Sequence, residues 1–192
     1  MCRGIMELSN ALIYGDRLYC GSAEVANATL VLSTSTSKSP WLRKVLEPTK
    51  TVVFINTDML RAFEARDQNA INNPVEASII AEIVEELVNN GVDSKDIGII
   101  TPYNSQASLI QHAMPTASVE IHTIDKYQGR DKDCIIVSFV RSREKPRSSG
   151  SSLLGDWHRI NVALTRAKKK LIMVGSQRTL SKVPLLMLLL KK

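Results

Sequence analysis

The sequence predicts an α/β protein in which one parallel sheet is covered by helices on both faces. Five apolar segments lack polar alternation, which is typical of strands that are buried on both sides. Helical segments lie between several of them, as in parallel sheets with crossover helices. The 192 residues are expected to form one domain with a sizeable core. The predicted strands are Thr51–Asn56, Asp96–Tyr103, Val119–Thr123, Cys134–Val140 and Leu171–Gly175.

The part of the chain before the first strand has weaker signals. Ile5–Tyr14 is expected to be a short helix, and Gly15 followed by Asp16 predicts a turn after it. The polar stretch Ser33–Pro40 predicts a loop, which we expect to extend through Lys50.

The clearest helix follows the first strand. Asn73 is a suitable N-cap, Pro74 suits the first helical position, and Glu76 occupies the position of a capping-box acid. Gly91 is a typical residue to end the helix. One apolar stripe runs along it: Val75, Ile79, Ile80, Ile83, Val84, Leu87 and Val88.

Two helices and a long loop complete the predicted topology. The helices are Asn104–Met114 and Asp156–Ala167, and the loop Arg141–Asp156 is rich in Ser, Gly, Arg and Lys. Ligands of parallel α/β sheets bind beyond the carboxyl ends of the strands. Polar residues at or just past those ends are Tyr103, Asn104, Thr123 and Arg141.

Composition excludes several classes of protein. Cys2, Cys20 and Cys134 share no CxxC spacing, which argues against a disulfide framework or zinc site and favours a reducing compartment. The longest apolar run, Val183–Leu190, is interrupted by Pro184 and is too short to span a bilayer. No basic-then-apolar signal peptide opens the sequence. Metal-ligand spacing is absent from the three histidines, His112, His122 and His158.

The net charge of +6 is unevenly distributed along the chain. Thr57–Asp96 holds nine acidic and three basic residues, whereas Trp157–Lys192 holds nine Lys or Arg and no acid. The basic part coincides with the polar motifs described next, which favours a polyanion such as nucleic acid as the partner. The alternative is a solvated basic face without a ligand.

The segment ITPYNSQ, Ile100–Gln106, ends one predicted strand and opens a helix. Its Thr101, Asn104 and Ser105 can cap that helix, whose free amides attract anions. Tyr103 offers a flat ring on which a base can stack. Ordinary strand-to-helix turn chemistry explains Thr101 and Asn104 equally well.

The segment TIDKYQGRDKD, Thr123–Asp133, precedes another predicted strand. Gly129 lets the backbone approach a ligand closely, and Gln128 and Arg130 are donors for phosphate. Asp131 is an acceptor suited to a ribose hydroxyl. A glycine beside charged residues is also common in hairpin loops.

The segment RINVALTRAKKK, Arg159–Lys170, carries two arginines seven residues apart, on nearly the same helix face. Two guanidiniums with Asn161 nearby favour an anion. Helix-end stabilisation explains Arg166 and the lysines Lys168–Lys170, but not Arg159, which has the wrong charge for a helix start. No GxxxxGK[ST] segment occurs, so the chain can complete a nucleotide site but is not expected to form one alone.

In this order, ITPYNSQ, TIDKYQGRDKDCIIVSFVRS and DWHRINVALTRAKKKLIMVGS resemble motifs IV, V and VI of the Upf-like superfamily 1B helicases. IMELSNALIYGDRLYCGS adds a likeness to the replication nuclease–helicases of the Dna-two type. The resemblance covers essentially the whole chain. In that family the second RecA-like domain opens with Gln-Tyr-Arg-Met, and Met1 stands at that methionine. We therefore expect the first RecA-like domain, with its Walker motifs, and the nuclease domain to lie outside this sequence.

The resemblance implies a RecA-like (P-loop NTPase-like) second motor domain of a 5′-to-3′ DNA helicase in replication and repair. It implies ATP with Mg²⁺ as the full enzyme's cofactors, an iron–sulfur cluster only in the nuclease domain, and an isolated chain that is inactive. Its expected partners are single-stranded DNA and the first RecA-like domain, in a monomeric nuclear enzyme with the mitochondrion as a further compartment. Arg166 corresponds to the arginine finger. The implied ATP-binding residues are Gln128, Gly129, Arg130, Asp131 and Arg166. The implied nucleic-acid contacts are Thr101, Tyr103, Asn104, Gln106, Thr123, Arg159 and Asn161.

Two alternatives remain open at the level of sequence. One is a non-catalytic nucleic-acid-binding module that has kept the basic face. The other is an RNA-directed Upf-like helicase, which shares every motif quoted, because backbone contacts carry little information on base or sugar.

Overall fold

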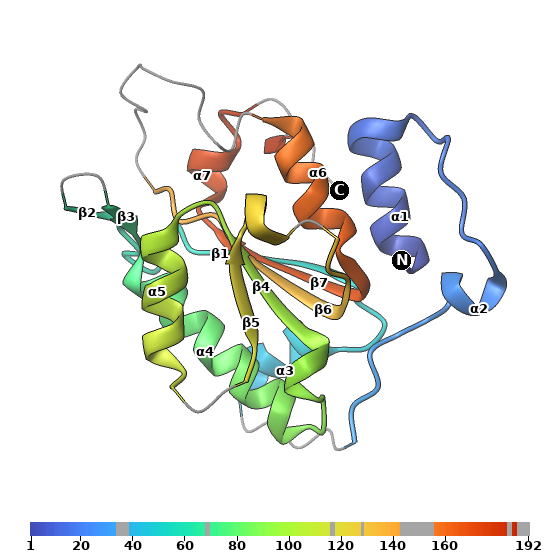
Figure 1. The fold of residues 1–192 in the computed structure, drawn as a ribbon, viewed down its shortest axis with the longest axis horizontal. Helices are drawn as coiled ribbons and strands as arrows, with labels where there is room; N and C mark the ends of the chain where they lie inside the picture. Colours follow the sequence, from blue (N-terminus) through green and yellow to red (C-terminus); the bar gives the residue numbers. More distant parts are fainter. Residues whose placement is uncertain are drawn as a thin grey trace.

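The computed structural model describes residues 1–33, 39–67, 70–115, 118–127, 129–142, 156–183 and 186–187. Its centre is a five-stranded sheet in which every pairing is parallel, with strand order β1-β7-β6-β4-β5 (Figure 1). The predicted α/β class and parallel sheet are confirmed. The strands are β1 (Val52–Asn56), β4 (Ile97–Thr101), β5 (Glu120–Thr123), β6 (Lys132–Ser138) and β7 (Ala167–Gly175).

Helices cover both faces of the sheet, and each face has its own apolar core (Figure 1). One face carries α1 (Arg3–Ser9), the π-helical turn η1 (Asn10–Tyr14), the 3₁₀ turn η3 (Ile124–Tyr127), α6 (Trp157–Thr165) and α7 (Gln177–Leu180). The other carries α3 (Pro40–Leu46), α4 (Pro74–Asn89) and α5 (Asn104–Ala113). The central strands β4 and β6 are buried from both sides, which explains their continuous apolar sequences.

Smaller elements lie outside this three-layer core. They are α2 (Ala23–Ala26), the 3₁₀ turn η2 (Ser94–Asp96) and an antiparallel hairpin of β2 (Ala65–Asp67) and β3 (Ala70–Asn72). The hairpin projects beyond the start of α5 (Figure 1). None of the helices that the structure describes is long and apolar enough to cross a membrane.

The start of α4 agrees only partly with the capping prediction. The Asn73 side chain accepts a hydrogen bond from Glu76 N at 3.2 Å, as an N-cap should. Glu76 does not complete a capping box, because the Asn73 N–H donates instead to Gln106 Oε1 at 2.7 Å. The Glu76 carboxylate is therefore available for another role inside the protein.

Two predictions about secondary structure are wrong. The segment 33–50, which was expected to be a loop, contains α3. This helix starts at Pro40, with Ser39 as its N-cap, and a proline is favoured at the first helical position. Lys168–Lys170 do not lie at the end of a helix, because β7 begins already at Ala167. Lys170 is 1% exposed, and its ammonium donates to the carbonyls of Glu47 and Lys50 at 3.0 and 2.7 Å.

Gly98 in β4 is a packing requirement. A Cβ at this position would overlap the Tyr127 hydroxyl and lie 2.9 Å from Ile135 Cδ1. We expect Gly98→Ala to lower the free energy of unfolding by about 1–3 kcal/mol, as overpacking of a core does. Urea denaturation measures this, with Gly21→Ala as the control because nothing lies within 4 Å of that added Cβ. Equal stability of the two variants would contradict the packing role.

Candidate functional site

The motif residues separate onto two opposite edges of the sheet. Thr101 and Thr123 are the last residues of β4 and β5 and are paired in register at the carboxyl edge. Asp131 and Arg166 directly precede β6 and β7, whose first residues Lys132 and Ala167 are paired at the amino edge. The sequence interpretation had placed Tyr103, Asn104, Thr123 and Arg141 at or just past the carboxyl ends and had given no edge for Arg166.

At the amino edge the Arg166 guanidinium is held by three neighbours. Its Nη1 lies 2.8 Å from Asp131 Oδ1, its Nε donates to Val162 O at 3.3 Å, and its Nη2 donates to Thr165 Oγ1 at 3.4 Å. A guanidinium has five N–H donors, so two remain for another ligand. The side chain is 24% exposed and is therefore accessible in this fixed orientation.

Gly129 and Arg130 directly precede Asp131 in the chain. Gly129 has φ +80°, a backbone conformation that favours glycine, and open space lies where a Cβ would be. Arg130 forms an ion pair with Glu120 at 3.1 Å and leaves half of its side chain exposed. Gln128 lies outside the described residues.

At the carboxyl edge a cleft of about 510 Å³ opens between the ends of β4 and β5 and the start of α5. It brings together Tyr103, Asn104 and Thr123, three of the predicted strand-binding residues. Asp125, which sequence reasoning missed, lies in its wall. The described residues that line it are Ala70, Pro102, Tyr103, Asn104, Ser105, Thr123 and Asp125.

Two other residues predicted to contact nucleic acid are fully buried. Gln106 is 0% exposed, and its amide exchanges hydrogen bonds with the Asn73 backbone and donates to Ser138 Oγ at 3.2 Å. Because these hydrogen bonds use both the oxygen and the nitrogen of its amide, Gln106 belongs to the protein interior and not to the surface of the cleft. Thr101 is also 0% exposed, and its hydroxyl has no hydrogen-bond partner among the described residues.

The two arginines of α6 are paired with separate carboxylates. Arg159 Nε lies 3.0 Å from Asp125 and 3.8 Å from Asp156, the N-cap of the helix. These acids explain how Arg159 is tolerated at a helix start, for which the sequence offered no reason. Because Arg166 pairs with Asp131, the two guanidiniums need no shared external anion.

Asn161 lies on α6 but not in the cleft. Its Nδ2 donates to the Tyr14 hydroxyl of η1 at 2.8 Å. Its Oδ1 is buried without a partner among the described residues. The contact with η1 makes Asn161 a residue that positions α6.

A third arginine, Arg141, was noted in the sequence only for its place after a strand. Its Nε lies 2.9 Å from Glu64 Oε2, and its Nη1 donates to the Tyr103 hydroxyl at 3.3 Å. The Glu64 side chain is 1% exposed. Arg141 follows β6 and Tyr103 follows β4, and the chain leaves these neighbouring strands in opposite directions. Such a switch point is where α/β sheets bind ligands, and this signal could have found the group.

A buried network fixes the turn that carries Arg141. Glu76 Oε2 accepts hydrogen bonds from Ser138 Oγ at 2.7 Å and from Val140 N at 2.9 Å, while Asn73 Nδ2 donates to Val140 O at 3.1 Å. These bonds hold Val140 at φ +68°, a strained conformation for a β-branched residue. Burial raises the pKa of Glu76 to about 7.

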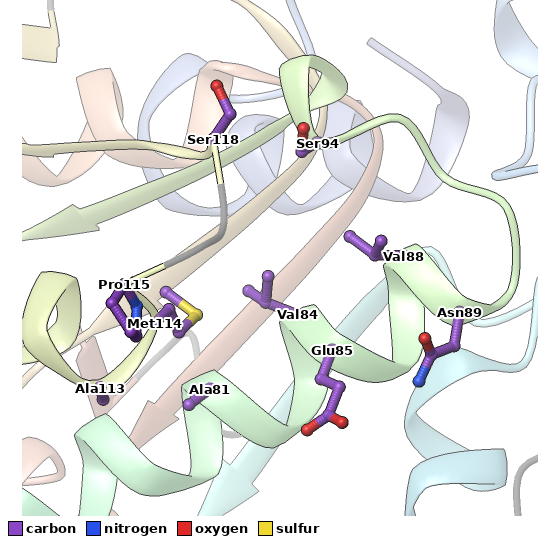
Figure 2. A pocket seen from close by; sticks show the side chains of 10 residues that line it. All are labelled: Ala81, Val84, Glu85, Val88, Asn89, Ser94, Ala113, Met114, Pro115 and Ser118. Carbon is purple, nitrogen blue, oxygen red and sulfur yellow. The ribbon is translucent and has the colours of Figure 1, made fainter.

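A separate hollow of about 480 Å³ lies between the C-terminal parts of α4 and α5 and the segments that lead into β4 and β5 (Figure 2). Val84, Val88 and Met114 form much of its wall, and Glu85 is the one charged residue among the described residues that line it. No predicted site residue lies there. Among the described residues there is also no group of three or more His, Cys, Asp or Glu that could hold a metal ion.

Comparison with known proteins supports the resemblance seen in the motifs. A family model described as an AAA domain matches residues 1–178. The "DNA replication ATP-dependent helicase/nuclease JHS1" of Arabidopsis thaliana is 93% identical over 192 residues, covering 100% of this chain and 14% of that protein. The mouse "DNA replication ATP-dependent helicase/nuclease DNA2" is 44% identical over 199 residues, covering 96% of this chain and 18% of the mouse protein. The human protein of the same name is 42% identical, covering 94% of this chain and 18% of its own length. The chain thus spans less than a fifth of these relatives.

Proposed function

The chain belongs to the AAA domain family, and from this membership we propose that it is the second RecA-like motor domain of an ATP-dependent DNA helicase. Its relatives named helicase/nuclease support this assignment. One observation carries it. The segment from Thr123 to Asp131 and helix α6 both run from the carboxyl edge to the amino edge, and they are tied by Arg159–Asp125 at one end and Arg166–Asp131 at the other. The residues proposed to contact single-stranded DNA and those proposed to contact ATP therefore belong to one packed unit.

At the amino edge, the proposed ATP site is shared with a partner domain that carries a phosphate loop. Arg166 would stabilise the charge that develops on the transferred γ-phosphoryl group, using its two remaining donors. Gly129 leaves room beside it, and Asp131 both orients Arg166 and offers an acceptor to a ribose hydroxyl. Arg130 would add a cation near the phosphates. The 192-residue chain alone is expected to show no ATP turnover, since it contains no phosphate loop.

At the carboxyl edge, single-stranded DNA would cross the cleft lined by Tyr103, Asn104 and Thr123. The Tyr103 ring would stack on a base, and its hydroxyl is held by Arg141. Gln106 and Asn161 would act by positioning, because their hydrogen bonds are made within the protein.

The remaining features of the whole enzyme are part of the same proposal. They are movement in the 5′-to-3′ direction, Mg²⁺ bound with ATP, an iron–sulfur cluster in the nuclease domain and a monomeric state. We also propose a nuclear location and a role in replication and repair, of which the relatives' names support only replication.

Strand binding by the chain is testable directly. Fluorescence anisotropy with a labelled single-stranded DNA should show an affinity that falls steeply between about 50 and 200 mM salt, since phosphate contacts release counterions. Tyr103→Ala should weaken binding about tenfold through loss of stacking, whereas Tyr103→Phe, which keeps the ring, should lose less. Tyr19→Ala is the control, because Tyr19 is 86% exposed and is not among the described residues that line the cleft of Tyr103. An affinity that does not depend on salt concentration and is unchanged in Tyr103→Ala would contradict the proposal. Equally strong binding to RNA would favour the RNA-directed alternative.

A further inference from the structure

A second cleft opens at the carboxyl edge, beside the ends of β1 and β7. Its volume is about 540 Å³. None of its residues is among the nucleic-acid contacts that the sequence interpretation assigned, although Ser142 and Ser176 are the last residues of the segments quoted as motifs V and VI. Its lining is Thr57, Asp58, Met59, Arg61, Ala62, Phe63, Ser142, Ser176 and Arg178.

Two large apolar side chains stand open to solvent in this cleft. Met59 is 90% exposed and Phe63 is 71% exposed, although both belong to residue types that are normally buried. Neither packs into the apolar core of either sheet face. Exposed apolar surface of this kind marks a binding site when polar groups lie beside it.

The polar groups in the cleft are suited to an anion. The Arg61 guanidinium has no ion-pair or hydrogen-bond partner among the described residues, and the φ of +45° at Arg61 is unusual for a residue other than glycine. Thr57 is 2% exposed, and its buried hydroxyl likewise lacks a partner within the described part of the chain. Asp58 is already occupied, because it accepts from Ser176 Oγ at 2.6 Å and from Arg178 N at 3.0 Å. The exposed guanidinium and the buried hydroxyl can both bind an oxygen-rich ligand.

A chain of contacts links this cleft to the cleft that holds Tyr103. Phe63 is followed directly by Glu64, which binds Arg141, which in turn binds the Tyr103 hydroxyl. Glu64 N also donates to Ser142 Oγ at 2.6 Å, and Ser142 lines the second cleft. The two clefts are about three strand spacings apart along the edge, or roughly 14 Å at about 4.8 Å per strand.

We propose that this second cleft is a further subsite for single-stranded nucleic acid, in which one base packs on Phe63 and Met59 and its phosphate binds Arg61. The Thr57 hydroxyl supplies a hydrogen bond to the same nucleotide. This assignment rests on the proposed function, and it extends the bound strand from β4 and β5 across the edge to β1. A base beside a phosphate matches the pairing of exposed apolar side chains with one free guanidinium.

The test uses a labelled single-stranded oligonucleotide long enough to cover both clefts. Phe63→Ala should weaken binding about five- to tenfold, the effect typical of one lost stacking contact. Arg61→Gly should weaken it by a similar factor and reduce its salt dependence, while the fold is kept because glycine accepts the positive φ. Tyr19→Ala and Arg43→Ala are matched controls, an exposed aromatic residue and an exposed arginine of α3, and both should bind like the parent chain.

A photoreactive 5-bromouracil oligonucleotide gives a second readout. Cross-linking followed by peptide mapping should identify the peptide that contains Phe63, in addition to the one that contains Tyr103. If Tyr103→Ala weakens binding while Phe63→Ala and Arg61→Gly do not, and no cross-link reaches Phe63, the subsite is refuted and the proposed function stands. If none of the three variants changes binding, the proposed function fails as well.

Discussion

Replacing Arg166 by alanine is expected to reduce nucleic-acid-stimulated ATP hydrolysis by about 10³-fold or more in an enzyme that joins this domain to a phosphate-loop domain. The guanidinium is fixed by Asp131, Val162 and Thr165, so its free donors are already oriented when charge develops on the γ-phosphoryl group. Strand binding should be largely unchanged, because Arg166 lies at the opposite edge from the cleft of Tyr103. Steady-state turnover and anisotropy, measured on the same variant, separate the two effects.

Two further variants sharpen this experiment. Arg166→Lys should restore little turnover, since an ammonium lacks the planar fork that matches two phosphoryl oxygens. Arg159→Ala is the matched control, because it removes a guanidinium from the same helix that is also paired with carboxylates. It should alter strand binding more than basal turnover. The structural alternative expects Arg166→Ala only to lose a partly exposed ion pair, at most about 1 kcal/mol of stability. Normal turnover with a lowered melting temperature would remove Arg166 from the catalytic role.

Local signals predicted most of the sheet and its helices correctly. The strands lack polar alternation because helices cover both faces, and α4 begins at Asn73 and Pro74 as the sequence indicated. The exceptions have physical causes. Three consecutive lysines are typical of the C-terminal end of a helix, yet Lys170 lies in β7. It can be buried there because the carbonyls of Glu47 and Lys50, which follow α3, accept hydrogen bonds from its ammonium. That compensation comes from residues about 120 positions away, which no local pattern contains.

The candidate site was predictable in its residue types but not in its arrangement. The motifs identified Arg166 and Tyr103, but the rule that ligands bind at carboxyl ends located only Tyr103 and its neighbours and gave no place to Arg166. Asp131 and Arg166 directly precede β6 and β7 and lie at the amino edge, whereas Asp125 and Arg159 of the same two motifs lie near the carboxyl edge. Glu64 could not be found at all from a motif, because its contact with Arg141 joins residues 77 positions apart. Long-range pairing of this kind is settled by the fold and not by local sequence.

Replacing Glu76 is expected to have a large effect on the stability of the protein. It lies at the centre of the network that holds the strained Val140 and thereby aims Arg141 at Tyr103. Glu76→Ala should lower the free energy of unfolding by about 3–5 kcal/mol, because it leaves buried donors of Ser138 and Val140 without an acceptor and opens a cavity. The affinity of this variant for single-stranded DNA should also fall, even under conditions where it remains folded, because the turn that carries Arg141 is no longer fixed.

The pH dependence follows from the raised pKa. In the folded protein the pKa of Glu76 is about 7, against 4.5 for the unperturbed group, so between these values the folded state binds more protons than the unfolded state. Its contribution to stability is therefore fully present below about pH 4.5 and is lost as the pH rises to about 7.

Glu76→Gln keeps an acceptor for Val140 N but cannot ionise. We expect its free energy of unfolding, relative to the parent chain, to rise between pH 5 and pH 8 by on the order of 3 kcal/mol. Glu82→Gln, an exposed acid on the same helix, should show no such trend in urea denaturation. A Glu76→Gln difference that stays constant with pH would mean that the buried carboxyl does not titrate in this range, and that the turn before Arg141 is held equally well by the charged and the neutral side chain.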